Sequence, residues 1–319
     1  MTSVRVVASA TLGPYLAGAS PVEDPLATPR ARKMMSRSAY LAARCLADLL
    51  PSIDGERSAI AYYLGVGGSA GSLDDVTRLL DASIAGEVFS LPAFGDRGLA
   101  ACNPLLAFQL MNNFTMCHGA ILEGLGGPNG AIFSRGVGTI AALAEAVHAV
   151  RSGDASCAIT GGADVATHPV TLAELARDGH LARGMVPADG AALIALGPST
   201  AGNDVIIEGC AHASGRGRPI ADAIDDALAR SRASGTPNKV VLAPWGPAAA
   251  DALASYAATR FPNVRAIDTS ARGETLAASA AFAVVAGIDA LGGAPGRTLV
   301  LTLGVDADPG VVVLSRGVA

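Results

Sequence analysis

The 319-residue sequence is poor in aromatic side chains, which make up 4% of it, and charged residues account for only 16%. The formal net charge of −5 is modest and no basic stripe is present to neutralise phosphates, so a nucleic-acid partner is not expected. Segments that stay disordered combine low hydrophobicity with high net charge, whereas half of these residues are apolar. The chain is therefore expected to fold around a large core.

Cysteine is also scarce. The five cysteines are far apart without CxxC spacing, which predicts reduced thiols rather than a disulfide framework or a metal site. The N-terminus has no apolar core of a signal peptide, and every apolar run is interrupted before it reaches roughly 18 residues. We therefore expect a cytoplasmic protein that does not enter a membrane and holds neither cofactor nor metal.

Glycine, with 38 residues, and alanine are abundant, which suits closely packed helices and sheets. Apolar strand-like runs alternate with Ala-rich helical segments along the whole chain, and the pattern restarts after a linker-like stretch around 198–204. The order predicts an α/β protein with helices on both faces of mixed sheets. We divide it into an N-terminal half, residues 1–203, and a shortened C-terminal half, residues 204–319.

Three stretches carry motifs that follow one another in a recognisable order. The strongest contains Gly-Pro-Asn, a glycine-rich turn, an Ala-rich helix and the strand Gly-Asp-Ala-Ser-Cys-Ala-Ile-Thr-Gly-Gly-Ala-Asp. The second is an Asp-Gly strand, and the third pairs a Lys-Met-Met-Ser-Arg helix with Tyr-Leu-Gly-Val-Gly. Their positions are 124–164, 187–196, 33–37 and 63–67.

Over most of residues 1–197 these motifs resemble the β-ketoacyl synthases, which are condensing enzymes of the thiolase fold. Over the C-terminal half the resemblance is mainly topological. It implies a thiolase-like, layered α/β/α/β/α sandwich built from two duplicated halves with pseudo-twofold symmetry.

The resemblance also implies catalytic residues that this sequence lacks. The family uses a cysteine on a strand-to-helix turn, where the helix N-terminus stabilises the thiolate, and two histidines that stabilise an enolate. Counting from Gly-Pro-Asn, the nucleophile position is Gly136, a vestigial position without a side chain. The stretch 241–247 contains no histidine, and the second histidine position is Glu274. The five histidines present lie elsewhere in the sequence: His118, His148, His168, His180 and His212.

This combination resembles the chain-length-factor subunit of type II polyketide synthases, a catalytically degenerate relative of the ketosynthase. Glutamine commonly replaces the cysteine in that branch, so Gly136 departs from its common form. The resemblance implies no condensing activity of the chain alone. It also implies a heterodimer with an active ketosynthase and an acyl carrier protein that docks mainly on that partner.

Two segments are expected to form the dimer interface and the acyl tunnel: a helix over 103–123 and the strand 131–134 before the turn. Phe108, Met111 and Phe114 follow helical spacing, which plain core packing would also produce. A dry, apolar cavity would favour a growing acyl chain. The candidate tunnel and interface residues are Phe108, Met111, Phe114, Met116, Phe133 and Arg135.

Arg135 is expected to form a structural salt bridge, with an acid such as Glu274, or to plug the vestigial pocket. Asp164 and Asp189 are expected to orient turns through backbone hydrogen bonds.

Other interpretations stay open. The stretch 67–71 matches the G-x-S-x-G pattern of serine hydrolases at Ser69, although a Gly-rich turn explains it as well. Cys117 and His118 are neighbours on a helix, about 100° apart, and so form no natural dyad. A stand-alone acyltransferase or decarboxylase of this fold could use Ser134, Cys117 or Glu274. A homodimeric acyl-binding scaffold is the third possibility.

Overall fold

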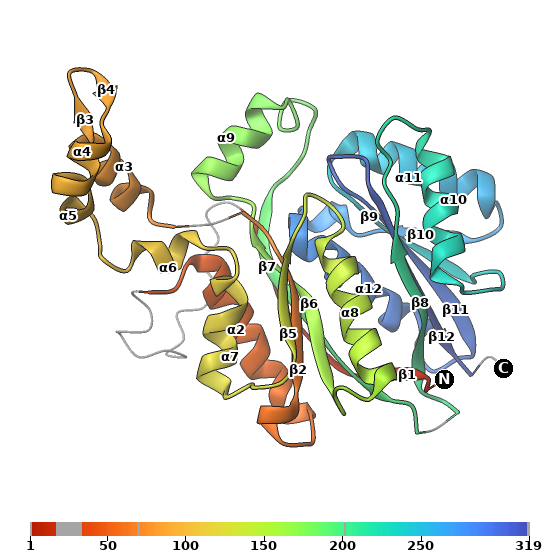
Figure 1. The fold of residues 1–319 in the computed structure, drawn as a ribbon. Helices are drawn as coiled ribbons and strands as arrows, with labels where there is room; N and C mark the ends of the chain where they lie inside the picture. Colours follow the sequence, from red (N-terminus) through yellow and green to blue (C-terminus); the bar gives the residue numbers. More distant parts are fainter. Residues whose placement is uncertain (1, 17–33, 69–70, 201, 318–319) are drawn as a thin grey trace.

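The computed structural model describes residues 2–16, 34–68, 71–200 and 202–317 (Figure 1). Its centre is a mixed sheet of ten strands, five from each half of the chain. The N-terminal strands are β1 (Val4–Leu16), β2 (Ala61–Val66), β5 (Asn129–Phe133), β6 (Ala158–Val165) and β7 (Ala188–Pro198). The C-terminal strands are β8 (Val205–His212), β9 (Lys239–Pro244), β10 (Arg265–Asp268), β11 (Gly296–Leu303) and β12 (Pro309–Arg316).

The two sets of strands have the same order and the same directions. The N-terminal order is β5-β2-β6-β7-β1 and the C-terminal order is β10-β9-β11-β12-β8. In each set the first three strands are parallel and the remaining pairings are antiparallel. The sets join where Arg5 of β1 pairs with Ile206 of β8. The duplication predicted from the sequence is therefore confirmed, including the hairpin of β11 and β12.

Helices form three layers around these strands (Figure 1). On the outer face of the N-terminal strands lie α2 (Arg37–Leu49) and α7 (Phe114–Glu123). The central layer holds α8 (Gly138–Ser152) and α12 (Ser279–Leu291), which contact strands of both halves. The outer face of the C-terminal strands carries α10 (Ile220–Ser231) and α11 (Pro247–Arg260). The predicted α/β/α/β/α layering is thus confirmed.

Glycine allows the central layer to lie close to the sheet. A Cβ atom at Gly65 of β2 would lie 2.1 Å from Oγ1 of Thr139, and one at Gly162 of β6 would lie 2.5 Å from the same oxygen. Thr139 opens α8 and donates this hydroxyl to the carbonyl of Ala277. The two glycines therefore let the beginning of α8 reach the segment that leads into α12, and side chains there would push the layers apart.

An arm, residues 72–102, projects from the layered body between β2 and β5 (Figure 1). Ser72 caps its first helix by accepting the N–H of Asp75 at 3.3 Å. The arm contains α3 (Leu73–Ala82), the hairpin β3 (Ile84–Ala85) and β4 (Val88–Phe89), α4 (Leu91–Ala93), a π-helical segment (Phe94–Gly98) and α5 (Leu99–Ala101). A short helix, α6 (Leu106–Leu110), leads from it back to the body.

The continuous helix expected over 103–123 is wrong, because α6 and α7 are separate. Met111 ends α6 in an extended conformation, with φ −88° and ψ 118°. Asn112 and Asn113 follow, and asparagine side chains compete with helical hydrogen bonding. The helix expected from Arg30 begins at Arg37, behind the N-cap Ser36, and residues 30–33 lie outside the described part.

The remaining elements are short. They are α9 (Pro169–Arg177) and the 3₁₀ turns Leu50–Ser52, Arg57–Ala59, Ser270–Arg272 and Leu276–Ala278. Within the described ranges, no helix combines the length and the apolar character that a membrane crossing requires.

Candidate functional site

The turn between β5 and α8 holds the predicted nucleophile position, and it is packed against the opposite half. A Cβ atom at Gly136 would lie 2.6 Å from Cα of Gly304. A Cβ atom at Gly304 would in turn lie 2.2 Å from the carbonyl oxygen of Arg135. Real Cβ atoms do not approach backbone this closely, so a cysteine at position 136 has no room unless the backbone moves.

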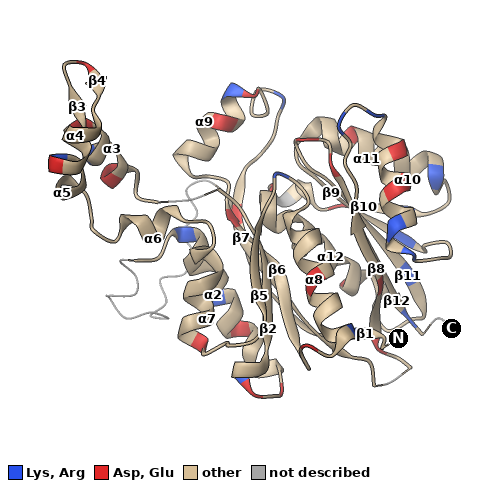
Figure 2. Cartoon of the chain, viewed as in Figure 1, with Lys and Arg blue, Asp and Glu red and all other residues tan. Residues whose placement is uncertain are grey.

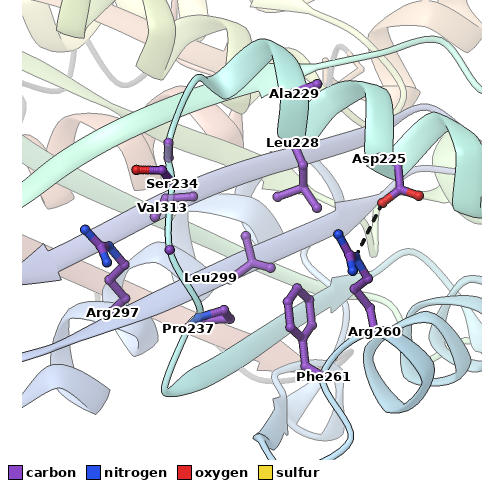
Figure 3. Close-up of a pocket in the computed structure, with 12 residues that line it drawn as sticks. Asp225, Leu228, Ala229, Ser234, Pro237, Arg260, Phe261, Arg297, Leu299 and Val313 are labelled. Carbon is purple, nitrogen blue, oxygen red and sulfur yellow. Dashed lines mark ion pairs between the residues drawn. The ribbon is translucent and has the colours of Figure 1, made fainter.

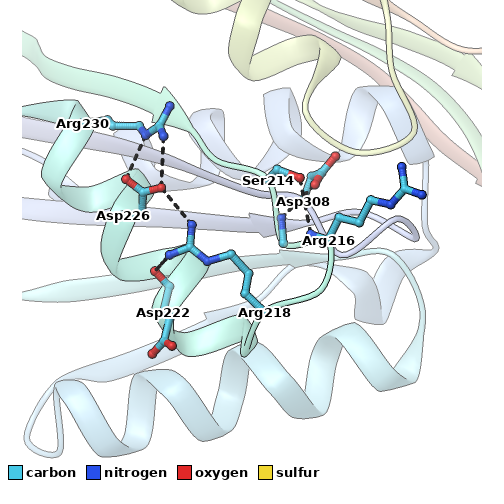
Figure 4. Close-up of polar contacts among 8 residues, drawn as sticks. Ser214, Arg216, Arg218, Asp222, Asp226, Arg230 and Asp308 are labelled. Atoms are coloured by element: carbon cyan, nitrogen blue, oxygen red, sulfur yellow. Dashed lines mark hydrogen bonds and ion pairs between the residues drawn. The ribbon is translucent and has the colours of Figure 1, made fainter.

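The loop that covers Gly136 is the tip of the β11–β12 hairpin, residues 304–308. The N–H of Gly304 donates to the carbonyl of Asp308 at 3.3 Å. The Asp308 carboxylate accepts the N–H of Gly215 at 2.9 Å, which ties the hairpin tip to the segment after β8 (Figure 4). The loop over the Gly136 turn is therefore anchored from two sides.

Arg135 lies at the rim of this turn, with 44% of its side chain exposed. Its guanidinium is 3.3 Å from the Asp178 carboxylate beyond α9 and 3.9 Å from that of Asp306 in the hairpin tip. Arg177 first, and then Arg135, lower the pKa of Asp178. The suggested pairing of Arg135 with Glu274 is wrong, since the Glu274 carboxyl is buried in the interior and bonds the N–H of Gly246.

A small hollow remains beside the turn, with a volume of about 80 Å³. We call it the turn pocket. Burial raises the pKa of its Asp164 to about 7, against the opposing effect of N–H donors from Ala277 at 3.1 Å and Val165 at 2.7 Å. Asp164 therefore orients backbone, as predicted. The pocket is lined by Gly67, Gly68, Phe133, Ser134, Arg135, Asp164, Thr171, Glu174, Leu175, Trp245, Leu276 and Val305.

Asp189 also holds a turn, and it does so from β7. Its carboxylate accepts the N–H and the hydroxyl of Thr167, both at 2.9 Å, and it pairs with Arg37 of α2 at 2.8 Å. The prediction that Asp189 orients a turn through hydrogen bonds is confirmed. The ion pair with α2 is an addition that the sequence did not indicate.

The stretch where a first histidine was sought, residues 241–247, places Trp245 beside the turn pocket. The indole is 7% exposed, and its Nε1 atom bonds no group in the described part of the chain. His180 lies on the other side of this stretch: Nδ1 of His180 would be 3.8 Å from a Cβ atom at Gly246. Burial and Arg183 lower the pKa of His180, and Nδ1 accepts from Arg183 at 3.2 Å because a guanidinium only donates.

Glu274 occupies the turn before α12, the C-terminal counterpart of the Gly136 turn. It is 6% exposed, and burial raises its pKa to about 7, although the hydrogen bond from the Gly246 N–H opposes this rise. Its backbone pairs with the chain at the beginning of β7: its N–H donates to Val186 at 2.8 Å, and its carbonyl accepts from Ala188 at 3.0 Å. Glu274 therefore fixes three segments to one another.

The predicted tunnel residues divide into two environments. Phe108 of α6 and Phe114 of α7 meet edge to face, with ring centroids 4.9 Å apart, and His118 lies 5.2 Å beyond Phe114. Met111, in the break between the helices, is 49% exposed. Met116 instead is buried in the core beneath α2, where it packs against other apolar side chains. The predicted tunnel residues therefore do not share one continuous helical face. Instead, Phe108, Phe114 and His118 form a group of ring contacts where α6 and α7 meet, which we call the aromatic stack.

Phe133 ends β5, which is an edge strand of the sheet, and is 55% exposed. The arm presents further apolar side chains to solvent, interspersed with charged residues of both signs (Figure 2). Single exposed apolar residues are ordinary, but a group on one projecting element is typical of a protein contact. These residues are Leu73, Leu80, Ile84, Val88, Phe89, Leu91 and Leu99.

Comparison with known proteins agrees with this geometry. Residues 28–200, more than half of the chain, match the family model described as "Beta-ketoacyl synthase, N-terminal domain". The chain belongs to the β-ketoacyl synthase family. No curated protein sequence matches it.

Solved structures of ketosynthases share its fold over the whole length. The ishigamide ketosynthase/chain length factor matches with a TM-score of 0.75 and 20% identity, over 98% of this chain and 99% of that one. A structure titled AntDE:AntF, a type II polyketide acyl-carrier protein in complex with its hexaketide-bound ketosynthase, gives 0.75 and 11% identity over 99% and 100%. The oxazolomycin ketosynthase domain OzmH KS7 of Streptomyces albus JA3453 gives 0.68 and 16% identity over 100% and 74%. The thiolase-like fold is thereby confirmed.

Sequence reasoning missed the features of this ketosynthase-like chain that depend on long-range contacts. The Gly136–Gly304 contact joins residues from the two halves, and only the glycines themselves could have hinted at it. His180 follows α9, a helix that the sequence did not predict, and so its approach to Gly246 was also missed. Ser69, the centre of the G-x-S-x-G match, lies outside the described residues.

Proposed function

We propose that this ketosynthase-like chain is the non-catalytic, chain-length-factor-like subunit of a polyketide-forming pair. It binds a cysteine-bearing ketosynthase and shapes the cavity in which that partner extends its acyl chain. One observation carries the proposal: Gly136 lies directly against the backbone of Gly304. The space that a nucleophilic side chain would need is filled by main chain from the other half.

The two histidine positions support the same conclusion. Decarboxylative condensation requires groups that stabilise a developing enolate oxygen next to the thiolate. Trp245 offers only one N–H donor, and that atom is buried. The Glu274 carboxyl is occupied by the Gly246 N–H. Three unsuitable groups on an otherwise intact scaffold favour a subunit that acts through its shape.

The partner surface follows from exposed features of the N-terminal half. The free edge of β5 can accept another strand, because its outer N–H and C=O groups have no neighbour in the described sheet. Phe133 at the end of this edge and Val88 and Phe89 on the arm add apolar area. We assign these elements to the contact with the ketosynthase and expect the acyl carrier protein to dock mainly on that partner.

The aromatic stack is the candidate boundary of the shared cavity. Phe108 is 36% exposed, and it packs against Phe114 next to the exposed Met111. Apolar groups at the end of a dry tunnel limit the length of the chain that fits. Replacing Phe114 or Met111 by alanine should therefore lengthen the partner's product, whereas Met116→Ala should affect stability alone.

The stand-alone enzyme is less well supported. Ser134 and Asp164 both line the turn pocket, and a pKa of about 7 suits Asp164 to act as a base. These two residues are therefore the best candidates for catalysis by the chain alone. Cys117 packs with the outer-face core, and burial raises the pKa of its thiol, which weakens it as a nucleophile. Glu274 is held by the hydrogen bond described above.

Intact-protein mass spectrometry separates these possibilities. The chain and its co-expressed ketosynthase would be incubated with an acylated carrier protein, and each subunit would then be weighed. The proposal predicts an acyl adduct on the partner's cysteine alone. An adduct on this chain, mapped to Ser134 or Cys117, would establish the stand-alone enzyme instead. If the chain instead purifies as a homodimer without the co-expressed ketosynthase, the homodimeric acyl-binding scaffold would be established.

A further inference from the structure

A second cavity lies far from the vestigial turn, on the outer face of the C-terminal strands. It has a volume of about 380 Å³ and opens between the end of α10, the segment 233–237 and the end of α11 (Figure 3). We call it the outer pocket. It is lined by Asp225, Leu228, Ala229, Ala233, Ser234, Gly235, Pro237, Arg260, Phe261, Arg297, Leu299 and Val313.

The floor of the outer pocket is apolar. Leu299 of β11 and Val313 of β12 project from the sheet, and Leu228 and Phe261 close the sides (Figure 3). Leu299 and Val313 are 2% and 8% exposed and belong to the core cluster beneath α10 and α11, so only a small part of each side chain reaches the pocket. Small-molecule sites typically measure about 300–1,000 Å³ and combine such a floor with a few fixed polar groups.

Arg297 supplies the first polar group. Its Nε atom donates to both carboxylate oxygens of Glu208, at 2.9 and 3.0 Å, which fixes the guanidinium plane. No described residue accepts a hydrogen bond from its two terminal nitrogens. Gly235 lies directly against the guanidinium, since a Cβ atom at this position would lie 2.2 Å from Nη1, and 20% of the Arg297 side chain remains exposed. The positive φ of Gly235, 97°, independently favours glycine there.

Arg260 supplies the second polar group from the opposite side of the floor (Figure 3). Its Nε atom is 4.0 Å from the Asp225 carboxylate, which also accepts the Tyr256 hydroxyl at 2.6 Å. Tyr256 thus orients the Asp225 carboxylate through a hydrogen bond, and this carboxylate forms the ion pair with Arg260. Arg297 and Arg260 therefore lie on opposite sides of one apolar floor, and each has a carboxylate partner, Glu208 and Asp225 respectively (Figure 3).

We propose that the outer pocket binds a short aliphatic molecule that carries one carboxylate. The aliphatic part lies over Leu299 and Val313, and the carboxylate accepts from the terminal nitrogens of Arg297, with Arg260 adding a second positive charge. A planar guanidinium matches a carboxylate with two parallel hydrogen bonds, and the apolar floor favours a hydrocarbon over a hydrated anion. This site is independent of the proposed partnership, because the sheet separates it from the vestigial turn.

Titration of the full chain with octanoate, followed by the methyl NMR signals of Leu228, Leu299 and Val313, tests the proposal. The three residues should shift together, and affinity should rise roughly fourfold for each methylene from hexanoate to octanoate. Arg260→Gln and Arg297→Gln should each weaken binding at least about tenfold. Arg265→Gln, an exposed arginine of β10 outside the pocket, is the matched control and should leave the affinity unchanged.

Octylamine, with the same hydrocarbon and the opposite charge, should leave the three methyl signals in place. The proposal is overturned if octanoate moves none of them, if octylamine binds equally well, or if Arg260→Gln binds octanoate as tightly as the Arg265→Gln control. Arg260 is exposed and lies at the edge of the fold, so its replacement keeps the test valid even if Arg297→Gln fails to fold.

Discussion

The two halves of the chain have the same strand order, but they connect equivalent strands very differently. In the C-terminal half, β9 reaches β10 through α11 alone. In the N-terminal half, the equivalent strands β2 and β5 are separated by the arm, α6 and α7. The additional segment exposes apolar side chains, whereas the C-terminal connection is packed against its sheet. The duplicated scaffold thus supplies the fold, and the insertion supplies the exposed apolar surface that we propose for the partner.

The equivalent turns before the two central helices differ as well. The turn before α8 has a glycine, Gly136, pressed against main chain of the other half. The turn before α12 has a buried carboxyl, Glu274, that bonds the N–H of Gly246. Both turns hold the layers together, and neither presents a free reactive group. The two turns thus occupy equivalent places in the two halves and carry different residues.

The largest effect is expected from Gly136→Cys, which would place a thiol at the turn before α8. The new Cβ atom would meet Gly304 Cα at 2.6 Å, so the free energy of unfolding should fall by about 3 kcal/mol in urea titrations. Gly293→Ala, where no atom lies within 4 Å of the new methyl group, should change it by less than about 0.5 kcal/mol. A Gly136→Cys variant of unchanged stability, with a thiol that alkylates readily, would contradict the account.

The next effect concerns the arm. Replacing Val88 and Phe89 together by serine removes two side chains that are 63% and 50% exposed. Affinity for the partner ketosynthase, measured by surface plasmon resonance, should fall about 100-fold, while the unfolding free energy of the isolated chain changes by less than about 0.5 kcal/mol. Val170→Ser on α9, which is 48% exposed, serves as the control and should leave binding intact. Equal binding of all three proteins would assign the arm no role in the partnership.

The next prediction concerns the pH dependence of stability, in which the two turns differ. The pKa of Glu274 is raised to about 7, so the folded chain keeps a proton that the unfolded chain releases near its ordinary value of 4.5. This contribution to stability is complete below pH 4.5 and is lost as the pH rises through 7, at up to about 1.4 kcal/mol per pH unit. Glu274→Gln should flatten the decline of stability across this window, and Asp164 should account for the part that remains.

Unfolding titrations between pH 4.5 and 7 measure this slope. Glu145→Gln, at an exposed position of α8, is the matched control and should keep the parent slope. If Glu274→Gln also keeps it, the carboxyl is not buried in the way described.

The smallest effect is expected at Arg135. Its two ion pairs are largely solvated, and such pairs contribute less than about 1 kcal/mol each. Arg135→Ala should therefore lower the melting temperature by only a few degrees, and high salt should reduce the difference between the two proteins. A loss of stability that salt leaves unchanged would instead indicate a packing role at the rim of the turn.

Local patterns predicted much of the fold, because strand and helix periodicity is written in neighbouring residues. The Gly-Pro-Asn strand, the helix after it and the final hairpin are found where they were expected. Contacts between distant segments could not be predicted. The pairing of Arg135 with Asp178 and Asp306 depends on how α9 and the hairpin tip meet. The break at Met111 was missed because apolar spacing continued across Asn112 and Asn113, which end the helix locally.

We propose above that this chain shapes the acyl cavity and that the partner ketosynthase carries out the condensation. Release of carbon dioxide from malonyl carrier protein by the isolated chain, by the isolated ketosynthase and by their complex tests it most directly. We expect no release above background from this chain alone, full condensation by the complex, and products that lengthen when Phe114 is replaced by alanine. Decarboxylation or condensation by this chain alone, at a rate that the partner does not increase, would contradict it.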